Sequence, residues 1–364
     1  MMYTPWLLPP ALPPNPPVAN TIGSRLAADP PSAPRIALLG LDAQTADGVR
    51  EHLYRLFWDF EDLAVVDLGN LRKRTVDFAI PLLKELHSAN ILPVTLGAPS
   101  SFLPAQYLAF GELNRQVGVC ILDSRIRLRT ESTGTADAEN NLDAAVYRQR
   151  PPMYHLAHLG SQRQLVDPAL DALFMRRHFE RYTLGQSRAD LGELEPTVRD
   201  ADVLAIDLAG LAAAEVPAQE GFGPSGFSVQ EACQLAFYAG SSDRLSSFGL
   251  FGYRGGDASD RERETSLAAQ AQLIWYFMHG VSRRKGDFPV STSGLHEYVV
   301  DSKVADRLTF WRSERSNRWW VQVPVSVPDG EERNRLVACS YKDYLQISQS
   351  GDLPSRLQLA FSRY

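Results

Sequence analysis

Two aspartates close short apolar runs of this sequence. Asp123 ends VGVCILD (117–123), and Asp207 lies in DVLAIDL (202–208). An acidic side chain at the carboxyl end of a buried parallel strand lies where open α/β sheets place their chemistry. The stretch 203–231 continues from Asp207 through a Pro/Gly loop into an expected helix near Ser228. We interpret this stretch as built around a metal site from which most ligands are missing.

Three arginines follow Asp123 at every second position, namely Arg125, Arg127 and Arg129. If the strand continues past Asp123, these side chains share its face, because strand side chains alternate with a period of two. A buried carboxylate needs a counter-charge. We therefore expect one or more of these guanidiniums to pair with Asp123 and Asp207. The alternative is that the arginines lie on a solvated loop and the aspartates cap backbone amides.

The elements that must position these side chains alternate between buried strands and amphipathic helices, which favours a mainly parallel sheet covered on both faces. We predict a three-layer α/β/α fold with a doubly wound sheet of about eight strands. The strand candidates are 35–41, 63–70, 91–97, 117–123, 154–160, 202–208 and 245–253. The helix candidates are 47–57, 76–89, 101–110, 139–149, 167–180, 228–239 and 261–281.

The pattern of residue types divides the chain into three parts. We expect residues 1–34 to form a proline-rich arm, 35–285 the α/β/α domain, and 286–364 an extension packed on that domain. In the extension, RLTFWRS and RWWVQVP predict an antiparallel hairpin, and NRLVACS adds a further candidate strand. Two short helical pieces, separated by Gly351 and Pro354, end the chain.

Composition excludes several classes of protein. The 364 residues are 44% hydrophobic and 22% charged, with a formal net charge of -6. This balance argues against a nucleic-acid or anionic-membrane binder, which needs a basic face. The three cysteines lack metal-binding or disulfide spacing, and the N-terminus resembles neither a signal peptide nor a membrane helix. We expect a cytoplasmic protein.

Four motifs occur in order at the expected turns of the sheet: LGAPSS (96–101), LDSRIRLR (122–129), AIDLAGL (205–211) and GFSVQEA (226–232). Together they resemble the ureohydrolase superfamily of arginases, agmatinases and formimidoylglutamases, over roughly residues 35–281. The family pattern is GGDHS, DAHxD, DxDxxDP and a Gly-Leu-Ser/Thr-x-x-Glu helix start. SDRLSSFGLFGY (242–253) and the C-terminal extension resemble a divergent formimidoylglutamase-like branch. The resemblance implies an arginase-like fold.

In active members of that family, two histidines and four aspartates hold a pair of Mn²⁺ ions, which activate water to attack an amidine or guanidinium carbon. Asp123 and Asp207 match the two carboxylates that bridge both metals. The positions matching the other four ligands are occupied by residues that cannot replace them: Pro99, Arg125, Arg127 and Ala209. Two carboxylates alone cannot fix a dinuclear cluster.

The resemblance therefore implies an arginase-fold pseudoenzyme without a metal cofactor, acting by binding a protein or a small guanidino or acidic metabolite. The alternative is an active Mn-dependent hydrolase of linear amidine or guanidine C–N bonds. Glu231 matches the family glutamate that receives the substrate, and its place at a helix start also suits an acid that stabilises the helix dipole. We interpret His155 and His158 as structural. Family precedent makes a homo-oligomer an expectation as well.

Overall fold

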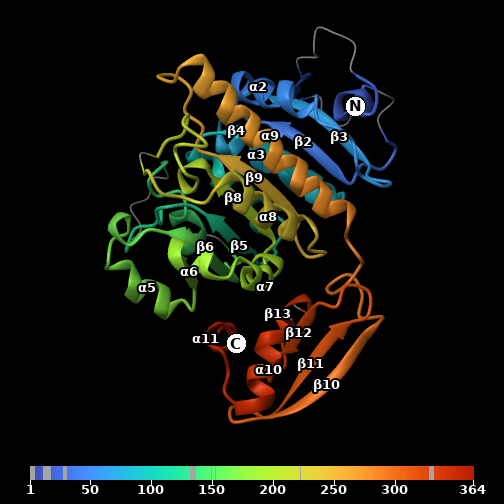
Figure 1. Ribbon diagram of the computed structural model, residues 1–364, viewed down its shortest axis with the longest axis vertical. Coiled ribbons are helices and arrows are strands. Elements are labelled where there is room, and N and C mark those ends of the chain that lie inside the picture. The colour runs from blue at the N-terminus through green and yellow to red at the C-terminus, as the bar shows by residue number, and fades with distance from the viewer. Residues whose placement is uncertain are drawn as a thin grey trace.

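A nine-stranded sheet forms the centre of the computed structural model (Figure 1). The structure describes residues 5–10, 18–27, 31–131, 137–148, 150, 151, 153–221, 223–327 and 332–364. The strand order is β1-β3-β2-β4-β9-β8-β5-β6-β7, and every neighbouring pair is parallel except β1 with β3. The strands are β1 (Leu7–Leu8), β2 (Ile36–Gly40), β3 (Val65–Leu71), β4 (Leu92–Ala98), β5 (Gly118–Leu122), β6 (His155–Ser161), β7 (Glu180–Thr183), β8 (Val203–Asp207) and β9 (Ser247–Phe251). The predicted mainly parallel sheet is confirmed.

Helices cover both faces of this sheet. The helices of the first part of the chain are α1 (Ile22–Leu26), α2 (Ala43–Leu53), α3 (Val76–Ser88), α4 (Leu103–Gly111), α5 (Leu170–Arg176), α6 (Leu184–Ala189), α7 (Glu195–Arg199), α8 (Val229–Gly240) and α9 (Asp260–Ser282). One core packs α2, α7, α8 and α9 on the sheet, and a second core packs α3, α4 and α5 on the opposite face. The molecule therefore has the three predicted layers.

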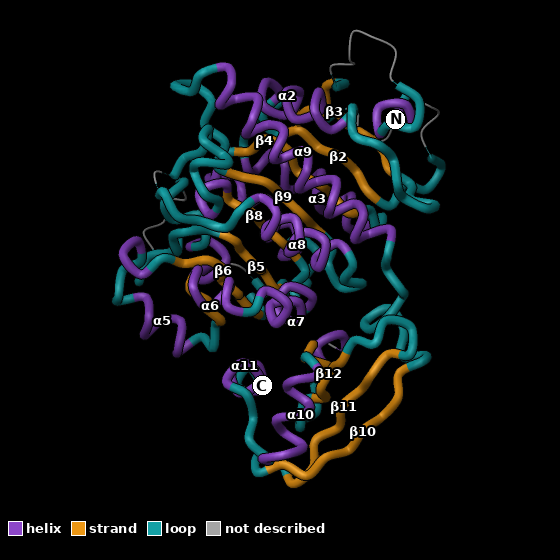
Figure 2. The backbone as a smooth tube through the Cα atoms, viewed as in Figure 1, coloured by secondary structure: helices purple, strands orange, loops and turns teal. Residues whose placement is uncertain are grey.

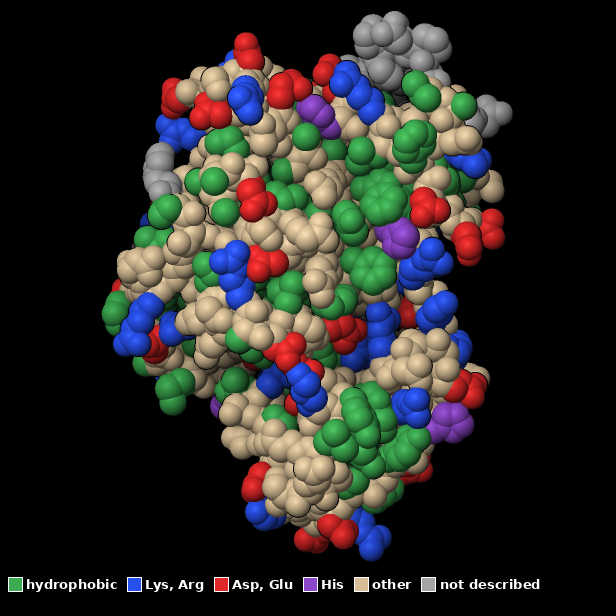
Figure 3. All heavy atoms as spheres, in the orientation of Figure 1, with side chains coloured by type: hydrophobic (Ala, Val, Ile, Leu, Met, Phe, Trp, Pro, Cys, Tyr) green, Lys and Arg blue, Asp and Glu red, His purple; other side chains and the backbone are tan. Residues whose placement is uncertain are grey.

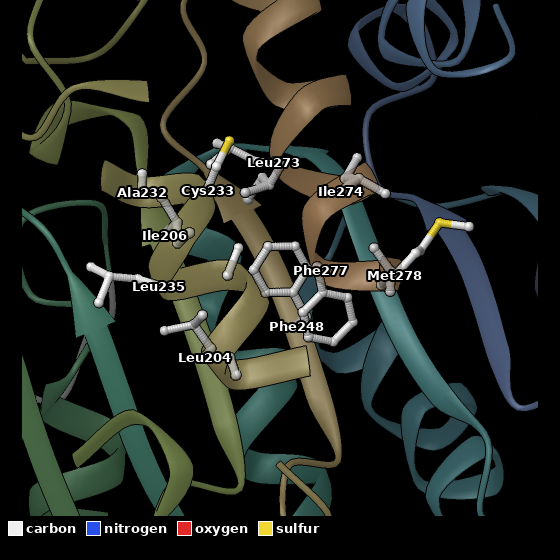
Figure 4. Close-up of a cluster of buried hydrophobic side chains, with 14 of the residues drawn as sticks. Leu204, Ile206, Ala232, Cys233, Leu235, Phe248, Leu273, Ile274, Phe277 and Met278 are labelled. Carbon is white, nitrogen blue, oxygen red and sulfur yellow. The ribbon is translucent and has the colours of Figure 1, made fainter. Parts of the chain in front are cut away.

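In the core under α8 and α9, alternate residues of a strand pack on the same face of the sheet. In Figure 4, Leu204 and Ile206 of β8 point toward the same helices as Phe248 of β9. Phe248 stacks on Phe277 of α9 with ring centroids 4.2 Å apart. The intervening Ala205 belongs to the core on the other face, as a period of two requires.

Within the body, two strands and three helices were absent from the sequence-based prediction, namely β1, β7, α1, α6 and α7. β1 places part of the proline-rich arm at one edge of the sheet, while residues 1–4, 11–17 and 28–30 of that arm lie outside the described residues. The predicted helix 167–180 ends early, and β7 begins at Glu180, followed by the two short helices α6 and α7. Of the predicted helix 139–149, the described residues include a five-residue π-helical segment, Ala144–Arg148.

The C-terminal extension is a second, antiparallel sheet backed by two helices (Figure 2). Its strands, in the order β10-β11-β12-β13, are β10 (Leu295–Ser302), β11 (Asp306–Ser313), β12 (Trp319–Gln322) and β13 (Leu336–Cys339). Its helices are α10 (Tyr341–Ser350) and α11 (Ser355–Phe361). The predicted hairpin corresponds to β11 and β12, and β10 was not foreseen. Gly351 ends α10 at a φ of 74°, in the left-handed region that glycine adopts readily.

The extension docks at the amino-terminal ends of the parallel strands. Arg199 of α7 donates to the carbonyls of Trp319 and Cys339, both at 3.1 Å. Arg333 pairs with Asp202, the residue directly before β8. Figure 3 shows charged side chains gathered along this boundary. The extension therefore lies at the opposite end of the parallel strands from Asp207.

No helix in the described part of the chain combines the length and apolar character needed to span a membrane.

Candidate functional site

Asp123 and Asp207 are brought together by the register of two neighbouring strands. β5 and β8 run parallel, with Leu122 opposite Ile206, and each aspartate is the next residue along its strand. Both side chains lie at the carboxyl-terminal ends of these strands and are almost fully buried. The predicted meeting of these two carboxylates at one edge of the sheet is therefore observed.

The guanidinium of Arg127 lies between the two carboxylates. Its Nε donates to Asp123 Oδ2 at 2.7 Å, and its Nη2 lies 3.2 Å from Asp207 Oδ2. Its Nη1 donates to the carbonyl of Ala138 at 2.8 Å. The arginine side chain is only 3% exposed. The ion pairs expected from the sequence are thus confirmed, with Arg127 as the cation.

These contacts shift the pKa of the Arg127 guanidinium. Burial acts to lower the pKa of its guanidinium, but the carboxylates of Asp207 and Asp123 outweigh it and raise that pKa. The arginine is therefore a permanent cation. A cation held this firmly occupies the space between two oxygens that could otherwise share a metal ion.

The surroundings of Asp207 shift the pKa of its carboxyl group as well. Burial and the neighbouring Asp123 raise the pKa of Asp207, while Arg127 and Ser100 act in the opposite direction. Ser100 Oγ lies 2.5 Å from Asp207 Oδ2 and 2.7 Å from Glu220 Oε2. One hydroxyl has one proton and cannot donate to both oxygens. The Ser100 hydroxyl therefore donates to Asp207 or to Glu220, and it links the two carboxyl groups.

The arginines on either side of Arg127 take other partners. The premise that the strand continues past Asp123 is wrong, because β5 ends at Leu122 and the following residues form an irregular loop. Arg125 pairs with Glu139 at 3.0 Å, and Arg129 lies 3.3 Å from Asp137. Both pairs are at the surface. The loop lets a single arginine reach inward instead of placing all three on one face.

The alternative role for the aspartates, capping backbone amides, is also present. Asp207 Oδ1 accepts from the amide of Ala209 at 3.0 Å, and Asp123 Oδ1 accepts from the amide of Arg125 at 3.2 Å. Each carboxylate therefore uses one oxygen for its own turn and the other for Arg127. Ion pairing and capping occur together.

The donor set does not suit a dinuclear metal centre. Proline and alanine side chains at Pro99 and Ala209 have no lone pairs to give, and a guanidinium has no acceptor. Arg127 further occupies the two carboxylates that remain, with one ion pair to each. Across the described ranges, no three His, Cys, Asp or Glu side chains are grouped so that they could hold a metal ion.

The space left beside these side chains is small. A cavity of about 10 Å³ is bordered by Asp123, Arg127, Asp207 and His158. This volume holds about one water molecule. Ligand pockets for drug-sized molecules measure about 300–1,000 Å³. As the side chains stand, the site admits no organic substrate.

His158 borders this cavity although the sequence marked it only as a structural residue. Its Nε2 lies 2.9 Å from the carbonyl of Arg125, so Nε2 carries the proton. Burial lowers the pKa of His158 to about 4, and the ring is neutral at physiological pH. Its Nδ1 has no hydrogen-bond partner among the described residues. His155 lies at the opposite end of β6, where it contacts Glu180.

Glu231 does not border this cavity. Its carboxylate and the hydroxyl of Ser228 form a capping box at the start of α8, the arrangement that stabilises helix N-termini. The same carboxylate forms a two-pronged ion pair with Arg188. Burial acts to raise the pKa of Glu231, but the hydrogen bonds from Arg188 and Ser228 lower it. The structure therefore gives Glu231 a capping role.

Sequence reasoning missed Ser100 and Glu220. Ser100 lies inside the LGAPSS segment, so its place after a strand was a usable signal. Glu220 lies in the loop between β8 and α8, and no local pattern distinguishes it from Glu215 in the same loop. Only the folded loop brings Glu220 to the hydroxyl of Ser100.

Comparison with known proteins connects this geometry to a fold. Neither the protein-family models nor the curated proteins give a match to the chain. Among solved structures, formiminoglutamase from Trypanosoma cruzi with Mn²⁺ aligns at 16% identity and a TM-score of 0.61, covering 73% of this chain and 99% of that one. Formimidoylglutamase from Bacillus subtilis aligns at 15% identity and a TM-score of 0.59, covering 68% and 87%. Arginase from Bacillus caldovelox aligns at 16% identity and a TM-score of 0.53, covering 67% and 98%. The chain therefore has the arginase-like fold of the ureohydrolases.

Proposed function

We propose that this protein is a non-catalytic member of the ureohydrolase superfamily, in which the Mn²⁺ pair has been replaced by an arginine. One observation carries the proposal: Arg127 lies buried between Asp123 and Asp207, at 2.7 and 3.2 Å from their oxygens. A cation at this place neutralises the charge that would attract a metal. Function then depends on binding, because a site can lose its chemistry while the scaffold persists.

The binding partner is a protein or a small guanidino or acidic metabolite. The extension of β10–β13 and the proline-rich arm are the candidate contact surfaces, since both lie at the periphery of the three-layer body. Self-association belongs to the same proposal. Size-exclusion chromatography with light scattering tests the homo-oligomer, and it requires a molar mass that is a multiple of 40.4 kDa.

The competing function is hydrolysis of a linear amidine or guanidine with one metal ion. The free Nδ1 of His158 favours it, because this nitrogen borders the same cavity as the two aspartates. For such an enzyme, Arg127 would have to leave its buried place to admit both metal and substrate. The cost of separating a buried, hydrogen-bonded pair, about 3–5 kcal/mol, disfavours this opening.

A turnover assay separates the two functions. The full chain, supplied with Mn²⁺, is incubated with formiminoglutamate, agmatine and arginine, and release of formamide or urea is measured against a Bacillus subtilis formimidoylglutamase control. The proposal expects no release above the background of chain without substrate. Release that scales with protein concentration and is lost in Asp123→Asn would show an active hydrolase.

A further inference from the structure

A second cavity lies where the C-terminal end of the chain meets the body. It measures about 210 Å³ and is far from the Asp123–Arg127 pair, at the amino-terminal side of β6. It is below the 300–1,000 Å³ typical of drug-sized ligands, so it suits a compact molecule.

Two neighbouring arginines form one wall of this cavity. Arg176 is the last residue of α5, and Arg177 is its C-cap. Cations are favoured there, because the helix ends in carbonyl groups that point toward them. Both side chains are exposed. Neither has an acidic partner in the part of the chain that the structure describes.

Arg363 lines the cavity as a third cation and is much more constrained. Its side chain is 4% exposed, and its Nη2 donates to Glu180 Oε1 at 2.8 Å. Its Nε and Nη1 are buried without a hydrogen-bond partner among the described residues. Leaving buried donors unpaired costs free energy, about 1–3 kcal/mol for each group. Both atoms are closed to solvent as the side chain stands, so Arg363 contributes its positive charge to the cavity wall rather than a free donor.

The charges around the cavity do not balance. Three guanidiniums, from Arg176, Arg177 and Arg363, line the cavity, whereas the one carboxylate paired with them is that of Glu180, which binds Arg363 and does not line the cavity. The difference is two positive charges. Guanidiniums bind carboxylate and phosphate oxygens in pairs of parallel hydrogen bonds, so an anion is the matching ligand.

The remaining wall combines apolar and aromatic side chains with two polar ones, His178 and Ser362. Met153, Tyr154 and Phe179 line the cavity, and the guanidinium of Arg363 lies over the Tyr154 ring at 5.6 Å from its centroid. An apolar or aromatic group of the ligand would pack here while its charged end meets the arginines. We propose that this cavity binds a small organic anion, a carboxylate or phosphate ester attached to a compact apolar group.

The site joins two parts of the chain. Arg176 and Arg177 belong to the body, whereas Arg363 is the second residue from the end of the described extension. An occupant would therefore bridge α5 and the C-terminal segment and strengthen their contact. The proposal stands independently of the proposed loss of catalysis, because it uses none of the residues around Asp123.

The test uses the full chain and titration calorimetry at constant ionic strength. The probes are phenyl phosphate, benzoate and inorganic phosphate, with neutral benzyl alcohol for comparison. We expect saturable binding of phenyl phosphate or benzoate with a Kd below about 1 mM. A rise in melting temperature should accompany it, because a ligand that binds only the folded state stabilises it. The stronger of the two aromatic anions identifies the charged group, and benzyl alcohol should not bind.

Variants locate the site. The double variant Arg176→Ala, Arg177→Ala should weaken binding of the aromatic anion by about tenfold or more, because charge-assisted hydrogen bonds are lost. The matched control is Arg163→Ala, Arg261→Ala, which removes two exposed arginines elsewhere and should leave the Kd unchanged. Absence of saturable binding by all three anions up to about 10 mM would overturn the proposal. Unchanged affinity in the Arg176/Arg177 double variant would overturn it as well.

Discussion

Replacement of Arg127 by methionine tests whether the buried cation holds the centre of the fold. Methionine keeps much of the side-chain volume but leaves Asp123 and Asp207 facing each other without a counter-charge. Removing one partner of a buried ion pair typically costs about 3–5 kcal/mol. The 3% exposure of Arg127 and its contacts at 2.7 and 3.2 Å put this pair in that class.

The loss should depend on pH in a defined direction. In Arg127→Met, burial and mutual repulsion raise the pKa of at least one aspartate above its unfolded value of about 3.9. A raised folded-state pKa contributes stability below the unfolded pKa and loses it as pH rises. The destabilisation should therefore be smaller at pH 5 than at pH 8, with a slope of up to about 1.4 kcal/mol per pH unit for one group.

Urea unfolding followed by tryptophan fluorescence measures this at pH 5 and pH 8, with the shift in midpoint converted through the slope of the transition. Arg125→Met is the matched control, because its surface pair with Glu139 is worth about 1 kcal/mol or less. Arg127→Lys keeps the charge and should lose less than the methionine variant. A loss under about 1 kcal/mol at pH 8, or one that is equal at both pH values, would refute the reasoning.

Three further substitutions test the roles of Ser100, Glu231 and Glu180. Ser100→Ala removes the hydroxyl that contacts both carboxyl groups and should cost about 1–3 kcal/mol of unfolding free energy at pH 7, measured by urea unfolding. An unchanged urea midpoint would count against a stabilising role of this hydroxyl. Glu231→Gln should cost about 1 kcal/mol of unfolding free energy through the weakened cap. It should change neither the Mn²⁺ content nor the product release of the chain, and a change in either quantity would restore Glu231 to a pocket role. Burial acts to raise the pKa of Glu180, but His155 and Arg363 hold it below its usual range, so its contribution to stability is present above about pH 4.3 and lost as pH falls. Glu180→Gln should accordingly be most destabilised near pH 7, by about 3–5 kcal/mol, and approach wild type in acid; a constant deficit across acid titration of the melting temperature would contradict this.

The sheet was predictable because its strands are apolar runs at helix-separated intervals. The segments around β2, β4, β5 and β8 are buried on both faces, so each reads as a continuous hydrophobic stretch. β1 and β7 gave no such signal. β1 has only two residues, and the β7 segment ERYT carries charged and polar side chains, of which only Glu180 is buried, through ion pairs formed only in the fold.

The centre of the site was predictable in its chemistry and less so in its geometry. Two acids at the ends of neighbouring strands, with arginines close behind, were enough to expect a buried ion pair. Which arginine turns inward depends on the loop after Leu122, whose path is set by contacts such as that of Arg127 with the Ala138 carbonyl. Glu220 could not be foreseen, because its approach to Ser100 spans 120 residues of sequence.

The central claim, that Arg127 has replaced the metal pair, is tested most directly by counting metal. Protein purified in added Mn²⁺ and passed through a desalting column is analysed by elemental mass spectrometry, beside Bacillus subtilis formimidoylglutamase treated in the same way. The account predicts well under one equivalent of Mn²⁺ per chain for this protein. Close to two equivalents per chain would contradict it, because Arg127 could not then occupy the place between Asp123 and Asp207.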